Sequence, residues 1–176
     1  MGWAREEPPE DDGWTEDADP ESVARTILLD QLSIKARSRR ELEERLARRN
    51  VPADIAARLL DRFEEVGLVD DEAFARGWAE GRQRTRGLAR TAIAAELRRK
   101  GVAEETARTV LAEIDPEVEE EAARALVRQR LRSMRGVDEV TAARRLVGML
   151  ARKGYPSGLA YAVVRAELGA EWASDD

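Results

Sequence analysis

Arginines grouped around one predicted helix junction are the side chains best suited to binding chemistry in this 176-residue sequence. A guanidinium is permanently charged and presents five hydrogen-bond donors. Several of them in one loop therefore predict contact with a polyanion or with an acidic protein partner. The group surrounds Gly87 and consists of Arg82, Arg84, Arg86 and Arg90. A rival explanation is arginine-rich coding composition, because only three of the 30 basic residues are lysines.

Cations also recur at the ends of three predicted helices. They are Arg48 and Arg49, then Arg98, Arg99 and Lys100, and finally Arg152 and Lys153. At the C-terminus of a helix, a cation complements the helix dipole and contributes about 0.3–1 kcal/mol. The alternative is a periodic basic stripe that faces phosphates or acidic protein surfaces. Composition and spacing leave both hypotheses open.

The residue types needed for catalysis and for metal binding are scarce. The sequence contains no Cys and no His. This excludes disulfides and thiolate chemistry, and it removes the commonest general base and the commonest metal ligand. There is no Gly-rich phosphate loop, and the acids fall at helix-cap and i,i+4 positions that account for them. We therefore expect a binding protein with no enzymatic activity, no catalytic residues, no metal and no cofactor.

The net charge of −6 is divided unevenly along the chain. Residues 1–24 hold nine acids against one base, and residues 171–176 hold three acids. This leaves 24 acids and 29 bases, about +5, in residues 25–170. A basic body between acidic ends is a pattern typical of proteins that bind nucleic acid or acidic partners.

Residues 1–18 mix acids, Pro and Gly without a periodic apolar pattern, which predicts a disordered acidic tail. Trp3 and Trp14 within it are either incidental or a short anchor that docks on a partner or on the basic body. The segment lacks the basic start and apolar core of a signal peptide. No apolar run approaches the roughly 20 residues needed to span a bilayer, so we expect a cytoplasmic protein without membrane association.

The positions of capping residues, Pro and Gly predict a succession of helices. Ala, Leu, Glu and Arg are abundant and favour helix. Asp19 with Pro20 predicts a helix start, and Ser38 with Glu41 fits a capping box. No segment alternates as a strand would, so we predict an all-α fold. The expected helices span about 20–35, 38–50, 52–67, 70–85, 88–101, 103–114, 116–135, 138–154 and 156–169.

An internal repeat of roughly 50 residues relates these helices. An apolar ladder recurs at an offset of 51 residues and then of 53, and its first copy is Leu42, Leu46, Val51, Ala56 and Leu60. Asn50, Gly101 and Gly154 end equivalent helices. Such repeats predict a stacked, elongated and curved helical array with a partner surface along one side. The predicted divisions are an acidic tail at 1–18, an N-terminal helix at 19–37, repeats at 38–86, 87–136 and 137–169, and a C-terminal tail at 170–176.

Two other groups of residues have structural explanations. On one predicted helix a run of acids precedes a run of arginines, which suits the helix dipole and favours a solvated face. Within it, Glu120 and Arg124 form an i,i+4 pair. Phe74 and Trp78 are also four residues apart and are expected to pack in the core, with base stacking as the alternative. The arginines of the run are Arg124, Arg128, Arg130, Arg132 and Arg135.

The most specific segment of the sequence lies between residues 70 and 102. It contains Asp70-Asp71, Phe74-Ala75, Trp78, Arg82, Gly87 and the run Glu96-Leu97-Arg98-Arg99-Lys100-Gly101-Val102. This segment resembles the signature of the RecX family of regulators of the RecA recombinase. The resemblance covers about residues 22–168 and implies tandem three-helix repeats.

The resemblance implies a modulator, mainly an inhibitor, of the RecA filament on single-stranded DNA. Such a protein lowers RecA ATPase, strand-exchange and SOS coprotease activity, and so affects recombination and DNA repair. We expect a monomer that contacts the filament through the basic residues above, with weak direct DNA binding. The alternatives are a general DNA-binding helical-repeat protein, whose acidic tail weakens binding, and a scaffold for protein partners without RecA involvement.

Overall fold

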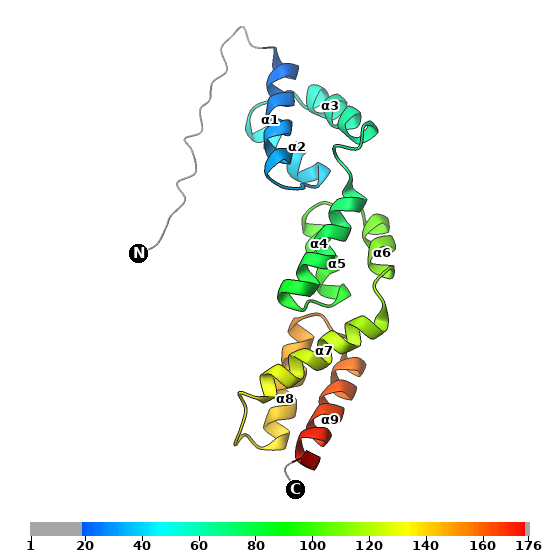
Figure 1. The fold of residues 1–176 in the computed structure, drawn as a ribbon. Coiled ribbons are helices and arrows are strands. Elements are labelled where there is room, and N and C mark those ends of the chain that lie inside the picture. The colour runs from blue at the N-terminus through cyan, green and yellow to red at the C-terminus, as the bar shows by residue number, and fades with distance from the viewer. Residues whose placement is uncertain (1–18, 175–176) are drawn as a thin grey trace, which may run out of the picture. The chain divides into compact units, whose positions relative to one another are not determined.

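The computed structural model describes residues 19–174, with side chains described as far as Ala170, and this range contains nine α-helices and no strand. The predicted all-α fold is confirmed (Figure 1). The predicted acidic tail, with Trp3 and Trp14, lies outside the described residues. The helices are α1 (Pro20–Ile34), α2 (Arg39–Arg48), α3 (Ala53–Glu65), α4 (Asp71–Arg86), α5 (Arg90–Arg99), α6 (Glu104–Ala112), α7 (Pro116–Leu131), α8 (Glu139–Arg152) and α9 (Ser157–Ser174).

Side-chain caps begin five of the described helices where the sequence predicts them. The backbone N–H groups of a first helical turn lack partners within the helix, and a capping oxygen supplies one. At the start of α2 the Glu41 N–H donates to Ser38 Oγ at 3.2 Å, and the Ser38 N–H donates to the Glu41 carboxylate at 3.2 Å. The predicted capping box is therefore confirmed. The capping residues are Asp19, Ser38, Asp70, Asp115 and Asp138.

Left-handed residues end equivalent helices of the repeat. Asn50, Gly101 and Gly154 have φ angles of 58°, 78° and 87°. Glycine adopts this region without steric cost, and Asn tolerates it better than most residues. The predicted equivalence of the three helix ends is confirmed.

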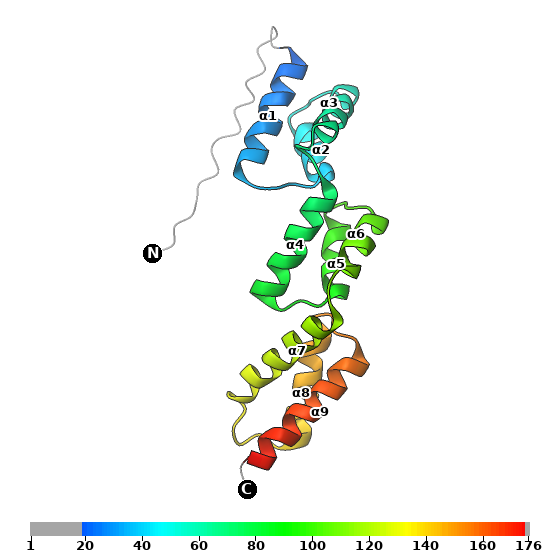
Figure 2. The ribbon, with the colours of Figure 1, turned by 45° about the vertical axis from the view of Figure 1, so that its right-hand side comes forward.

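The described helices form three modules of three helices, each with its own hydrophobic core. Module 1 consists of α1, α2 and α3, module 2 of α4, α5 and α6, and module 3 of α7, α8 and α9. The predicted tandem three-helix repeat is thus confirmed (Figure 2). By its internal contacts the chain divides into two units, one ending at Val69 and one beginning at Asp70. Fully buried side chains include Leu28, Leu46 and Leu60 in module 1, Ile93 and Leu97 in module 2, and Val127, Leu146 and Leu150 in module 3.

The modules begin one helix earlier than the predicted repeats. The predicted divisions at residues 38, 87 and 137 leave α1 alone and place α4 and α7 at the ends of repeats. In the structure, Phe74 and Ala79 of α4 enter a core with α5 and α6, and Val127 of α7 enters a core with α8 and α9. The apolar ladder marks only the second and third helices of each module. Periodicity does not specify whether their partner precedes or follows them.

Two helix ends differ from the prediction. Helix α7 ends at Leu131 rather than near Arg135, because the chain turns before Gly136, whose φ is 82°. Helix α9 continues to Ser174. The predicted C-terminal tail at 170–176 is therefore wrong for residues 170–174. Glycine inside a helix costs only about 1 kcal/mol relative to Ala, and no proline follows Gly169 to end the helix.

A membrane-spanning helix requires a long apolar stretch. None of the helices in residues 19–174 is long and apolar enough to cross a membrane.

Candidate functional site

Glu96 is the centre of the predicted basic cluster in module 2. Its side chain on α5 is 13% exposed and accepts hydrogen bonds from Arg82 Nε at 2.6 Å and from Trp78 Nε1 at 2.8 Å. Arg86 Nη1 lies 3.5 Å from the other carboxylate oxygen. Burial by itself raises the pKa of Glu96, but the two donors and the charges of Arg82 and Arg86 outweigh it and hold this pKa below its ordinary value. Arg82 and Arg86 are therefore engaged by an internal carboxylate.

The ring of Trp78 contacts two cations and a second aromatic ring. Arg82 Cζ lies 4.2 Å and Lys100 Nζ lies 4.4 Å from the ring centroid. The ring centroids of Phe74 and Trp78 are 5.8 Å apart. Phe74 is buried and Trp78 packs partly against the same core, which confirms the predicted packing. Cation–π contacts of this kind contribute about 0.5–1 kcal/mol at exposed sites.

Arg90, the last member of the cluster, is held by an acid of module 3. Glu119 on α7 is only 4% exposed. One of its oxygens accepts the backbone N–H of Arg90 at 2.7 Å, and the other accepts Arg90 Nε at 2.9 Å. Arg90 is the first residue of α5, and Ala89 before it has no side-chain oxygen for capping. Glu119 therefore supplies the missing cap of α5 from another module.

The turn between α4 and α5 is held by the turn between α8 and α9 as well. Lys153 Nζ donates to the carbonyl oxygen of Arg86 at 2.6 Å, and the carbonyl oxygen of Lys153 accepts the N–H of Ala89 at 2.9 Å. The Tyr155 hydroxyl donates to the carbonyl oxygen of Gly87 at 3.0 Å. Burial raises the pKa of Tyr155 to about 12, so the phenol remains a donor.

The two backbones approach closely at Gly154. A Cβ at this position would lie 2.6 Å from the nitrogen of Ala92 and 2.7 Å from its Cβ, so only glycine fits. We call this contact between modules 2 and 3 the 2–3 joint. It consists of residues 86–92 on one side and of Glu119 with residues 153–155 on the other. The joint uses Arg86, Arg90 and Lys153, three of the predicted binding residues, to hold modules 2 and 3 together.

The cations at equivalent helix ends do not share one role. In module 1, Arg48 Nε donates to the carbonyl oxygen of Glu44 at 3.3 Å. Arg49 is the C-cap residue that follows α2, and its backbone N–H donates to carbonyl oxygens of the last turn. In module 2, Lys100 lies over Trp78. In module 3, Lys153 is used in the 2–3 joint. Local capping of helix carbonyls explains part of the predicted stripe.

Four of the predicted binding arginines are exposed, and their guanidinium groups contact no described hydrogen-bond or ion-pair partner. Among the described residues, none of their guanidinium groups forms a hydrogen bond or an ion pair. Three belong to module 2 and one to module 3. They are Arg84, Arg98, Arg99 and Arg152.

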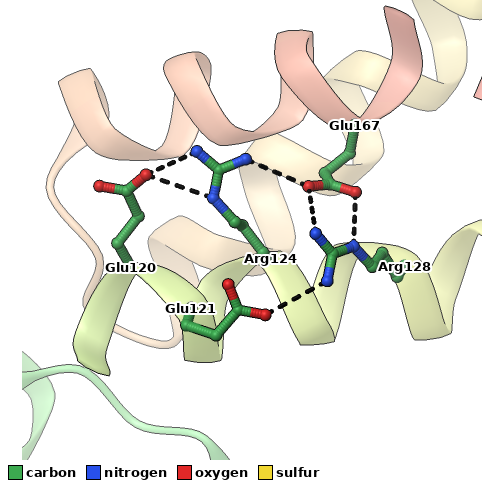
Figure 3. Close-up of polar contacts among 5 residues, drawn as sticks. All are labelled: Glu120, Glu121, Arg124, Arg128 and Glu167. Atoms are coloured by element: carbon green, nitrogen blue, oxygen red, sulfur yellow. Dashed lines mark hydrogen bonds and ion pairs between the residues drawn. The ribbon is translucent and has the colours of Figure 1, made fainter. Parts of the chain in front are cut away.

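The predicted run of arginines lies on and after α7, and its first two members are neutralised within module 3 (Figure 3). Arg124 donates to Glu120 at 2.6 Å, as the i,i+4 spacing predicts, and to Glu167 of α9 at 3.2 Å. Arg128 donates to Glu167 at 2.7 Å and to Glu121 at 3.2 Å. The hydrogen bond from Arg128, supported by Arg124, lowers the pKa of the buried Glu167 against the effect of burial.

Arg130 belongs to a different environment from its neighbours on α7. Together with Arg144, Arg145 and Arg152 of α8 it lines a groove between the two helices. The sequence prediction did not single out Arg144 and Arg145. The available signal was that both lack an acid three or four residues away on the predicted helix.

Metal binding finds no support in residues 19–174. In this range no three or more His, Cys, Asp or Glu side chains are grouped so that they could hold a metal ion.

Comparisons with known proteins assign all three modules to one family. Models of the first, second and third three-helix domains of RecX match residues 24–63, 70–111 and 117–164, in that order. Relatives with the name Regulatory protein RecX are 50% identical in Amycolatopsis mediterranei, Thermobifida fusca and Streptomyces coelicolor. These matches cover 82%, 84% and 87% of this chain and 83%, 80% and 81% of the relatives.

Solved structures show the same fold. The crystal structure of RecX from Lactobacillus salivarius matches with a TM-score of 0.79 at 17% identity, over 85% of this chain and 97% of that one. A crystal structure of a regulatory protein RecX matches with a TM-score of 0.75 at 26% identity, over 85% and 73% of the two chains.

Proposed function

Because the chain belongs to the RecX family, we propose that it regulates RecA, mainly as an inhibitor, by binding the RecA filament on single-stranded DNA. The observation that carries this proposal is the similarity to three relatives named Regulatory protein RecX. They are 50% identical to the chain, and each match covers at least 80% of both proteins. RecA is the partner that the family resemblance implies. We further propose that the chain acts as a monomer in the cytoplasm. It would take part in recombination, DNA repair and the SOS response.

The exposed arginines of module 2 are the proposed filament contacts. Arg84, Arg98 and Arg99 are available because no described carboxylate neutralises them. Guanidinium groups in this state bind carboxylates or phosphates through paired hydrogen bonds. Arg82, Arg86, Arg90, Lys100 and Lys153 would then act by positioning these contacts. Arg48 and Arg49 of module 1 remain predicted contacts.

The test is single-stranded-DNA-dependent ATP hydrolysis by RecA from the same organism, titrated with the full chain. We expect inhibition at a concentration well below that of RecA, because one regulator bound to a filament affects many protomers. A lack of effect at equimolar protein, with a helical circular dichroism spectrum, would refute the proposal. It would leave a helical-repeat DNA-binding protein or scaffold as the alternative.

A set of variants tests the contacts themselves. Arg84→Gln combined with Arg98→Gln and Arg99→Gln should weaken inhibition at least about tenfold, as expected when several charge-assisted bonds are removed. The matched control is Arg58→Gln combined with Arg135→Gln and Arg165→Gln, which removes the same charge from exposed positions outside module 2. Equal inhibition by the two sets would mean that only net charge matters.

A further inference from the structure

The groove between α7 and α8 is strongly basic. It has a volume of about 500 Å³ and is lined by Arg130 of α7 and by Arg144, Arg145, Gly148, Met149 and Arg152 of α8. No Asp or Glu lines it. A second hollow shares Arg130 and Met149 and adds uncharged polar groups from Gln129 and Ser133. Four guanidinium groups therefore border one concave surface.

Their positive charge is not neutralised by local partners. The four arginines are exposed, and within the described part of the chain none of their guanidinium groups donates to a carboxylate. Asp138 caps α8, and its pKa is lowered mainly by hydrogen bonds from Thr141 and also by the charge of Arg144. Like charges held in one groove repel each other unless an anion binds between them.

Gly148 opens the floor of this groove. It lies within α8, where glycine costs about 1 kcal/mol relative to Ala. A Cβ there would lie 3.3 Å from Arg152 Nη1, whereas a Cβ on Gly77, Gly81 or Gly158 would meet nothing within 4 Å. The missing side chain thus leaves room for the guanidinium of Arg152 along the helix surface.

We propose that the groove binds the phosphate backbone of single-stranded DNA and is the direct DNA contact of this regulator. The inference rests on the proposed function, since it names the part of the RecA filament that module 3 would touch. Guanidinium groups match phosphate oxygens through paired donors. A single strand is narrow enough to enter a groove between two packed helices, whereas a folded acidic surface is broader. Met149 offers an apolar surface for sugars or bases.

The test is direct binding of the full chain to fluorescently labelled oligo(dT) of 30 nucleotides, without RecA, measured by anisotropy over a range of salt. Arg144→Gln combined with Arg145→Gln should weaken binding about ten- to a hundredfold at 50 mM salt. For each phosphate that is no longer neutralised, the slope of log affinity against log salt should fall by about 0.7, so the pair should reduce it by about 1.4. The matched control, Arg58→Gln with Arg165→Gln, removes two charges outside the groove and should change affinity less than about twofold.

Three results would overturn the proposal. One is an equal loss of affinity in the control, which would indicate net charge alone. Another is unchanged affinity for oligo(dT) together with unchanged RecA inhibition in the groove variant. The third is unchanged oligo(dT) binding with loss of RecA inhibition in that variant, which would assign the groove to an acidic protein surface. If the groove variant loses DNA binding but the unaltered chain fails to inhibit RecA, the groove stands and the proposed function fails.

Discussion

Glu119 caps helix α5 from another module, through bonds to both the backbone and the side chain of Arg90. Its two carboxylate oxygens accept the Arg90 N–H at 2.7 Å and Arg90 Nε at 2.9 Å. Sequence alone suggests that Arg90 is free to bind a partner. The contact instead ties α7 of module 3 to the first turn of α5 in module 2, and it makes the stability of the two modules interdependent.

Glu119→Gln should destabilise the unit that begins at Asp70. The amide keeps one acceptor but loses the charge, and hydrogen bonds to charged groups contribute about 1.5–3 kcal/mol. We expect a loss near the lower limit, because Arg90 is partly exposed. Urea unfolding measures the free energy, and hydrogen exchange should accelerate at the amides of residues 86–92. Glu117→Gln, on the exposed first turn of α7, is the control. Equal effects of the two substitutions would contradict the capping role.

Gly154→Ala should be more damaging than the same change at another left-handed glycine. Gly67 has a φ of 72° and open space around it, so Gly67→Ala reports the backbone cost alone, about 1–2 kcal/mol. Gly154→Ala adds a clash with Ala92, and overpacking of this kind costs a further 1–3 kcal/mol or so. Denaturant unfolding measures both costs, and faster hydrogen exchange in α5 and α8 should accompany only Gly154→Ala. Similar losses in the free energy of unfolding for the two variants would show that the 2–3 joint accommodates the added Cβ without a large cost.

Stability should fall in acid through Glu96 and Glu167. Both have a folded pKa below the ordinary value, so the unfolded chain takes up protons first as the pH falls. Their contribution is complete above the unfolded pKa of about 4.3 and is lost as the pH drops through the lower folded values. Urea unfolding between pH 7 and pH 3 should show this loss. Glu167→Gln should flatten the dependence in that window, and an unchanged slope would rule out its ion pairs with Arg124 and Arg128 as a source.

Local chemistry made much of the fold predictable from sequence. The caps at Asp19 and Ser38 and the left-handed residues Asn50 and Gly101 follow from rules that act over a few residues. The repeat ladder identified equivalent helix pairs. It did not identify their third partner, because that choice depends on packing between helices that are separated along the chain.

Which arginines form ion pairs was less predictable, because some of their partners are also far away along the chain. Arg124 has an acid four residues away, and this pair was predicted and confirmed. Glu119 and Glu167 neutralise arginines 29 and 39 residues distant, which no helical spacing reveals. Arg144 and Arg145, which have no acid three or four residues away, are unpaired, but Arg84 is also unpaired although Glu80 lies four residues before it.

The acidic residues of segment 1–18 should weaken DNA binding by the basic body. Replacing its seven acids by their amides in the full chain keeps the length and brings the formal net charge from −6 to about +1. Affinity for oligo(dT) should rise several-fold at 10 mM salt, where charges interact over about 30 Å, and the gain should shrink at 150 mM, where they interact over about 8 Å. Replacing Pro8, Pro9 and Thr15 of the same segment by Ala is the control, since it alters composition without altering charge. An affinity that is unchanged at 10 mM salt would contradict the idea that this segment competes with phosphates for the arginines.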